Sequence, residues 1–155
     1  MSTEIDRYDA MCSAIAECVR VGQAKDIRDK AKALQDYSRQ AGNHEAERQC
    51  AIIRARAERR CGELLKAMAE SGERATQDTG RPEKVSPLVT LIEKPETLES
   101  LHISRMQSSR WQLIAEIPDA VFEKAIQNAI PTTRGLVDIA KEARRCRKRR
   151  EHGDS

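Results

Sequence analysis

Apolar residues along the first 70 positions recur every three or four residues, which is the period of an amphipathic helix. The pattern predicts three helices, at about residues 3–21, 24–41 and 44–70. Gly22 and Gly42 follow the first two, and Asn43 is placed to cap the third. The faces expected to pack inward comprise Tyr8, Met11, Cys12, Ile15, Cys18 and Val19 in the first helix, and Ile27, Ala31, Leu34 and Tyr37 in the second.

The third predicted helix is the longest, and at ~1.5 Å per residue it would span about 40 Å. Its stripe is rich in small side chains and comprises Ala46, Cys50, Ile53, Ala57, Cys61, Leu64, Leu65 and Met68. Small side chains let two helices approach closely. The stripe therefore indicates either an antiparallel helical hairpin or a coiled-coil seam between two chains, with a monomeric bundle as the alternative to a dimer.

Residues 71–95 interrupt the helical pattern with Gly72, Gly80, Pro82 and Pro87, which favour turns and loops. We interpret this segment as a linker. It would separate an N-terminal helical region for dimerisation or interaction, residues 1–70, from a second region, residues 96–155.

Four helices are predicted after the linker. A short helix at 96–101 is followed by a tight turn and a second helix at 104–117. Pro118 and Asp119 begin the next one, where proline suits a helix start because its missing N–H would be unpaired there anyway. Pro131 and Thr132 open the final helix, which runs into a basic segment at 144–150.

The composition favours an all-α fold with a thin core. Charged residues make up 34% of the chain and aromatic residues only 3%, and Val and Ile form no alternating strand pattern. Good helix formers dominate. The predicted architecture is a long N-terminal helical hairpin or three-helix region, a linker, and a C-terminal helix-turn-helix subdomain with a basic terminal helix.

Residues 97–122 carry the most informative chemistry, because they have the pattern of a helix-turn-helix. The inner faces would use Leu98, Leu101, Ile103, Trp111, Ile114 and Ile117. Ser104 is placed to cap the second helix and to contact a phosphate. Arg105 and Arg110 suit guanine edges or phosphates, and Gln107 and Ser109 suit base edges. These five residues are the predicted DNA-reading set.

The same segment resembles the helix-turn-helix of the ParB/KorB family. The resemblance rests on I-S-R-M-Q-S-S-R-W at 103–111 and L-I-A-E-I-P-D at 113–119. His102 stands where that family usually has Gly, and Ser108 where it usually has an apolar residue. The family's arginine-rich nucleotide-binding motif is not visible. The chain also looks like short phage and integrative-element proteins that combine K-D-I-R-D-K, here at 25–30, with Q-S-S-R-W; this resemblance implies DNA binding in a mobile element.

Positive charge is concentrated near the C-terminal end of the sequence. Residues 104–155 carry 11 basic and 7 acidic groups, whereas the whole chain has a net charge of +3. Phosphate contacts are predicted for Arg144, Arg145, Arg147 and Lys148. A solvated helix end and a site for an acidic protein remain alternatives. The arginines at 48, 54, 56, 59 and 60 alternate with glutamates and are expected to form a salt-bridged exposed face.

The sequence contains no pattern that indicates an enzyme. It lacks a phosphate-binding loop, a nucleophile elbow and paired histidines, and its five cysteines fit no zinc spacing, so no cofactor or metal is expected. The absence of a long apolar run predicts no membrane contact. An odd number of unpatterned cysteines and a charged start without a signal peptide favour a reduced, cytoplasmic chain.

These observations lead to two hypotheses from different classes. The first is a non-enzymatic, sequence-specific DNA-binding protein of a phage or mobile element, acting as a homodimer on double-stranded DNA in transcription regulation, partition or replication. The second is a protein-interaction inhibitor or adaptor, whose charged N-terminal helices would bind a host or phage protein, such as a host defence nuclease.

Overall fold

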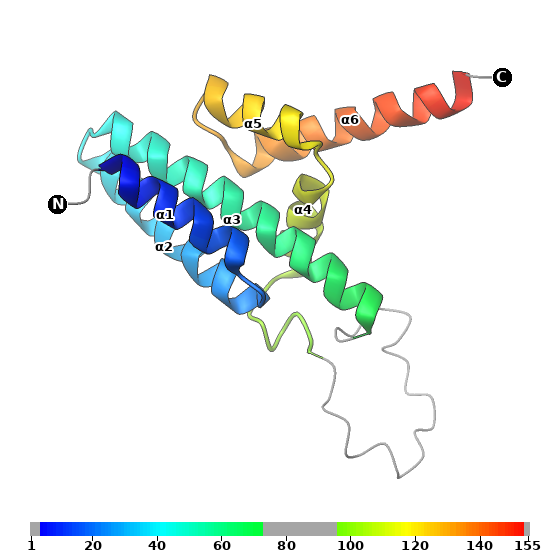
Figure 1. Ribbon diagram of the computed structural model, residues 1–155, viewed down its shortest axis with the longest axis horizontal. Helices are drawn as coiled ribbons and strands as arrows, with labels where there is room; N and C mark the ends of the chain where they lie inside the picture. Colours follow the sequence, from blue (N-terminus) through cyan, green and yellow to red (C-terminus); the bar gives the residue numbers. More distant parts are fainter. Residues whose placement is uncertain (1–3, 73–95, 154–155) are drawn as a thin grey trace, which may run out of the picture.

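The computed structural model describes residues 4–72 and 96–153, and six helices account for most of them (Figure 1). They are α1 (Glu4–Glu17), α2 (Val21–Gln40), α3 (His44–Ser71), α4 (Arg105–Ala115), α5 (Asp119–Asn128) and α6 (Thr133–Gly153). No strand occurs within these residues, so the predicted all-α fold is confirmed. None of the described helices combines the length and the apolar run needed to cross a bilayer.

Helices α2 and α3 form an antiparallel hairpin, and α1 packs on α3 beside it (Figure 1). The turn between α2 and α3 is built as the sequence predicts. Gly42 has a positive φ of 70°, and Asn43 caps α3 by accepting a hydrogen bond from the backbone N–H of Ala46 at 3.1 Å. The hairpin interpretation of the long stripe is therefore confirmed within one chain.

Both hydrophobic clusters join α3 to the helices that follow residue 96. The first comprises Ala55, Ile114, Ile117, Phe122, Ile126, Leu136, Val137 and Ala140. The second comprises Cys18, Val21, Ala24, Cys61, Leu65, Ile103 and Trp111. Residues of the same chain thus cover the centre of the α3 stripe. Dimerisation stays a prediction, and a dimer would have to use another surface. Of the predicted linker, residues 71–95, only residues 71 and 72 are among the described residues.

A charged network is buried where α2, α3 and α6 meet. The carboxylate of Glu58 has no exposed surface and accepts hydrogen bonds from Arg28 at 3.2 Å and from Thr133 at 2.9 Å. Arg54, itself buried, lies 3.9 Å from the same carboxylate. The guanidinium of Arg28 also lies over the ring of Trp111, 5.6 Å from its centre. This network connects α4 to the N-terminal hairpin.

The structure corrects the sequence prediction for the first two helices. Helix α1 ends at Glu17, and α2 begins at Val21 with Gly22 inside it, because the side chain of Gln23 accepts a hydrogen bond from the backbone N–H of Arg20 and starts the helix early. Val19 therefore lies between the helices and is exposed. Leu34 and Tyr37, predicted to face the core, are 56% and 71% exposed.

The short helix predicted at 96–101 is a turn. The side chains of Thr97 and Ser100 each accept a hydrogen bond from the other's backbone N–H at 3.1 Å. Such local bonds compete with helix formation. Leu98 and Leu101 still pack on the second cluster, and Ile103 is buried in it. The segment therefore anchors α4 without forming the first helix of a regular helix-turn-helix.

His102 has a φ of 53° and therefore adopts the left-handed conformation. This is the position at which the resembling helix-turn-helix usually has glycine. Replacing His102 by glycine is expected to raise the free energy of unfolding by about 0.5–1 kcal/mol, because relief of the strain exceeds the added freedom of the unfolded chain. Urea unfolding would measure this change. His44→Gly, at a helical position with ordinary φ, should destabilise the protein instead. If both glycine substitutions changed the free energy of unfolding in the same direction, His102 would not be strained.

Candidate nucleic-acid interface

Helix α4 begins at a well-defined cap. The hydroxyl of Ser104 accepts a hydrogen bond from the backbone N–H of Gln107 at 3.1 Å, and the side chain of Gln107 accepts one from the backbone N–H of Ser104 at 3.0 Å. This reciprocal pair is a capping box. The predicted N-cap is confirmed. Because the cap engages both side chains, Ser104 and Gln107 serve first to start the helix, and their predicted DNA contacts would have to coexist with that role.

The buried face of α4 is carried by Ser108, Trp111 and Ile114. Trp111 is 1% exposed, and its backbone carbonyl lies so close to Gly62 of α3 that a Cβ atom there would be 1.9 Å from the oxygen. Ser108, which stands where the resembling family usually has an apolar residue, is buried and accepts a hydrogen bond from Gln112 at 2.8 Å. Helix α4 is thus pressed firmly onto α3.

The opposite face of α4 is exposed and carries Arg105, Met106, Ser109 and Arg110. The side chains of Arg105 and Arg110 make no ion pair or hydrogen bond with another residue in the described part of the chain. Helix α4 also contacts α6, through its buried face, where Ile114 packs in the same cluster as Leu136 and Val137 of α6. The structure brings three of the five predicted DNA-reading residues, Arg105, Ser109 and Arg110, onto one accessible face.

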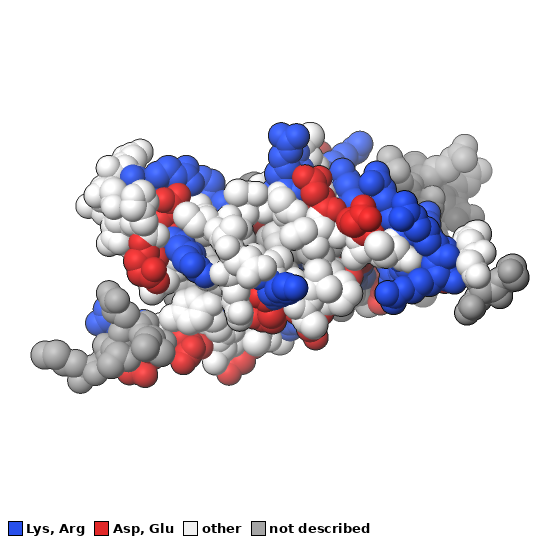
Figure 2. Space-filling model, turned by 90° about the horizontal axis from the view of Figure 1, so that it is seen from above, with Lys and Arg blue, Asp and Glu red and all other residues white. Residues whose placement is uncertain are grey.

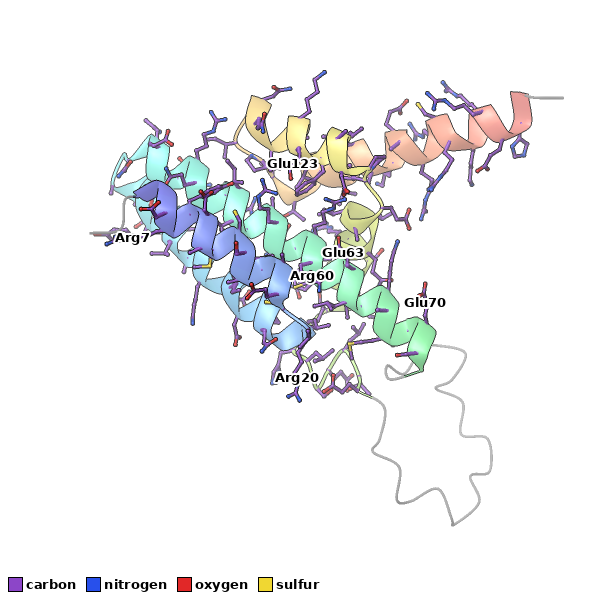
Figure 3. The ribbon with its side chains drawn as sticks, viewed as in Figure 1. Arg7, Arg20, Arg60, Glu63, Glu70 and Glu123 are labelled. Carbon is purple, nitrogen blue, oxygen red and sulfur yellow. The ribbon has the colours of Figure 1, made fainter. Side chains whose placement is uncertain are left out.

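The arginines of α3 behave differently from those of α4, and here the sequence prediction was wrong. Instead of forming an exposed face paired along the helix, most of them hold the later helices in place. Arg56 donates to both carboxylate oxygens of Glu123 on α5, at 2.6 and 2.9 Å, and Figure 3 shows Glu123 beside α3. Arg59 lies over the ring of Phe122, 4.6 Å from its centre, and also pairs with Asp119.

The other α3 arginines donate hydrogen bonds to backbone carbonyl groups. Arg54 donates to the carbonyl of Pro131 at 2.7 Å, Arg48 to that of Gln127, and Arg60 to that of Cys18 at 2.8 Å. Arg60 also pairs with Glu63 of the same helix at 3.0 Å (Figure 3). The other ion pairs within α3, Arg59 with Glu63 and Arg54 with Glu58, are longer, at 4.0 and 3.9 Å. These carbonyl acceptors have no signal in the side-chain pattern, so sequence reasoning missed them.

The base of the basic helix is fixed by an ion-pair cluster at the end of α4. Glu116 accepts hydrogen bonds from Lys66 at 3.0 Å and from Arg144 at 2.8 Å, and Arg147 lies 4.0 Å away. Burial raises the pKa of Glu116, but the hydrogen bonds from Lys66 and Arg144 outweigh it and hold the pKa below its ordinary value. Arg144 was predicted to contact DNA, and in the structure it first serves this cluster.

Farther along α6, basic side chains have fewer protein partners. Arg145 lies 3.6 Å from Glu142, whereas Lys148, Arg149 and Arg150 have no carboxylate partner within the described residues. Figure 2 shows the resulting concentration of Lys and Arg at the α6 end of the molecule. Arg149 and Arg150 therefore join the four residues of this segment singled out from the sequence.

The exposed arginines offer binding chemistry. Exposed guanidinium groups can donate paired hydrogen bonds to base edges and phosphates. Within the described residues, no cluster of three or more His, Cys, Asp or Glu side chains is arranged to hold a metal ion. No known family matches the chain, and neither a curated protein nor a solved structure matches it.

Proposed function

We propose that the protein is a non-enzymatic, sequence-specific DNA-binding protein in which the exposed face of α4 reads the duplex. The observation that carries the proposal is the contrast between two groups of arginines. Those of α3 are engaged by carboxylates and carbonyls of the chain, whereas Arg105 and Arg110 project from a rigidly held helix and have no such partner among the described residues. Two guanidinium groups that no residue in the described part of the chain engages, on one face, are suited to an external anionic ligand.

Physical chemistry favours a duplex as that ligand. Arginine can bind O6 and N7 of guanine with two hydrogen bonds, and the serine hydroxyl of Ser109 can donate to or accept from base edges. Specific reading requires a helix whose position does not adjust, and the packing of Trp111 against Gly62 supplies that rigidity. The basic residues of α6 would add phosphate contacts, which supply affinity and salt dependence without sequence preference.

The biological setting is a further part of the proposal. The resemblance to the ParB/KorB helix-turn-helix and to phage proteins supports a role at a site on a mobile element, in transcription, partition or replication. A homodimer would place two copies of α4 on half-sites about 34 Å apart, or a multiple of that distance. The exposed Leu34 and Tyr37 of α2 are available for such an association.

Arg105→Ala and Arg110→Ala are each expected to weaken binding to a duplex selected from a random pool by about 1–3 kcal/mol. The loss comes from hydrogen bonds to one base or phosphate, so the effect should depend on the base pair facing each arginine. Fluorescence anisotropy at fixed salt would measure it.

Arg7→Ala is the matched control, because Arg7 is exposed on α1 and lies at the end of the hairpin far from α4 (Figure 3). It removes the same charge and should leave affinity nearly unchanged. If both α4 variants bound the selected duplex as tightly as the Arg7 variant, α4 would not be the reading helix.

A second candidate function is supported by a different observation. Leu34 and Tyr37 form an exposed apolar pair one turn apart on α2, which is a feature of surfaces that bind proteins. An adaptor or inhibitor that acts through this surface would not need DNA. A gel shift at physiological salt separates the two: salt-sensitive duplex binding supports the first function, and its complete absence supports the second.

A further inference from the structure

In the last ten residues of α6, residues 144–153, no side chain is buried against the described part of the chain. Ala140 is the last buried residue of α6 and Ala143 the last half-buried one, and every side chain from 144 to 153 is exposed. Figure 1 shows this end of α6 running beyond α4 and α5 into solvent. We call residues 144–153 the basic extension.

Positive charge surrounds the axis of the basic extension instead of forming a stripe. Successive side chains of an α-helix are rotated by about 100°. The six basic residues are Arg144, Arg145, Arg147, Lys148, Arg149 and Arg150. With that rotation they point in directions that leave only one broad gap, on the side of Cys146. A helix that lies on a flat acidic surface would need its charges on one side only.

The same arrangement makes the isolated basic extension unfavourable by itself. Arg144 and Lys148, like Arg145 and Arg149, stand four residues apart and therefore neighbour each other on the helix surface, where like charges repel. Glu151 is the only acidic residue of the extension. A ligand with negative charge on several sides would relieve this repulsion, whereas a ligand on one side would relieve only part of it.

We propose that the basic extension lies in the major groove of B-form DNA, next to the site contacted by α4. This inference rests on the proposed function. A helix with side chains is about 10–12 Å across, and the major groove is ~12 Å wide with phosphates along both edges. The groove therefore offers negative charge on both sides of an inserted helix. The deep, narrow major groove of an A-form RNA duplex does not admit one.

The ion pairs at Glu116 give the basic extension a fixed starting direction. Glu116 follows α4 directly, and Arg144 begins the extension, so their contact at 2.8 Å connects the two DNA-facing elements. Lys66 of α3 donates to the same carboxylate. The reading helix and the extension are thereby held in one relative position, as a protein that follows a single groove requires.

The test compares Arg149→Ala/Arg150→Ala with the control Arg7→Ala/Lys30→Ala, which removes the same charge from exposed sites on α1 and α2. Alanine preserves helix propensity, and circular dichroism would verify that both variants fold. With the selected duplex, the first variant should lower the slope of log K against log salt by about two units, while the control retains the wild-type slope. Guanine N7 atoms face the major groove. Dimethyl sulfate footprinting should show some of them protected by wild type, protected still by Arg105→Ala and Arg110→Ala, and exposed again with Arg149→Ala/Arg150→Ala.

Each opposing result has a defined meaning. Wild-type duplex binding with the same slope and footprint in the Arg149/Arg150 variant would refute insertion of the extension and leave the role of α4 intact. If the Arg149/Arg150 variant exposed adenine N3 atoms, which face the minor groove, instead of guanine N7 atoms, insertion in the major groove would also be refuted. Equal binding to an A-form RNA duplex, weakened to the same degree by the variant, would mean that the extension contacts phosphates from outside. Absence of any wild-type duplex binding would overturn the proposed function itself.

Discussion

Replacing Glu58 by alanine is expected to lower the free energy of unfolding by about 3–5 kcal/mol. The substitution leaves two buried or half-buried guanidinium groups, Arg28 and Arg54, without their shared carboxylate. Burial lowers the pKa of Arg54, and the negative charge of Glu58 works against that shift, so the loss of Glu58 makes the charged form of Arg54 still less favourable. Urea denaturation, followed by the fluorescence of the only tryptophan, would give the value directly.

Glu63→Ala is the matched control, because Glu63 lies on the same helix and pairs with Arg60 at 3.0 Å, but its side chain is 41% exposed. Exposed ion pairs contribute about 0–1 kcal/mol. Glu58→Gln separates the charge from the shape of the side chain and should fall between the two. If Glu58→Ala cost no more than Glu63→Ala, the buried network would not stabilise the fold.

Helix boundaries that depend on local chemistry could be predicted from the sequence. Asn43 and Ser104 cap their helices through hydrogen bonds to backbone groups three residues away, and the hydroxyl of Thr132 accepts from the backbone N–H of Gly135 at 3.0 Å. Such contacts involve only neighbouring residues. The same locality misled the prediction at 96–101, since Thr97 and Ser100 bond to each other and end the turn before it becomes a helix.

The buried face of α2 could not be predicted from hydrophobicity. Gln35 and Ser38 are buried together with Ala24 and Ala31, whereas Leu34, one residue away from Gln35, points to solvent. The buried residues face the surface along which α2 and α3 pack, and the position of that surface depends on the neighbouring helix. The choice of face is therefore made by the packing partner, which a local pattern does not contain.

The candidate interface was predicted in part for the same reason. Arg105, Ser109 and Arg110 are exposed as expected, because their orientation follows from the position of Trp111 on the buried face. The engagement of Arg144 by Glu116, 28 residues earlier, depends on how α6 crosses α4. The α3 arginines have the composition of a solvated surface, yet several of them hold the later helices. Charge pattern alone does not distinguish arginines available for a ligand from those already paired.

Gly62→Ala is the second change with a large expected effect, a loss of about 1–3 kcal/mol in the free energy of unfolding. Alanine is the better helix former by ~1 kcal/mol, so propensity alone predicts the opposite sign. The new Cβ atom would lie 1.9 Å from the carbonyl oxygen of Trp111, which belongs to the backbone and moves only if α4 moves. Thermal and urea unfolding would measure the loss.

Gly22→Ala provides the control, because Gly22 lies within α2 and a Cβ atom there meets nothing within 4 Å. That substitution should stabilise the protein by about 0.5–1 kcal/mol. The displacement of α4 also connects stability to the proposed reading of DNA. At a temperature where both variants are folded, Gly62→Ala should weaken binding to the selected duplex while Gly22→Ala does not, although neither residue contacts the ligand. Unchanged stability of the Gly62 variant would show that α3 and α4 are not in the close contact on which the positions of Arg105 and Arg110 depend.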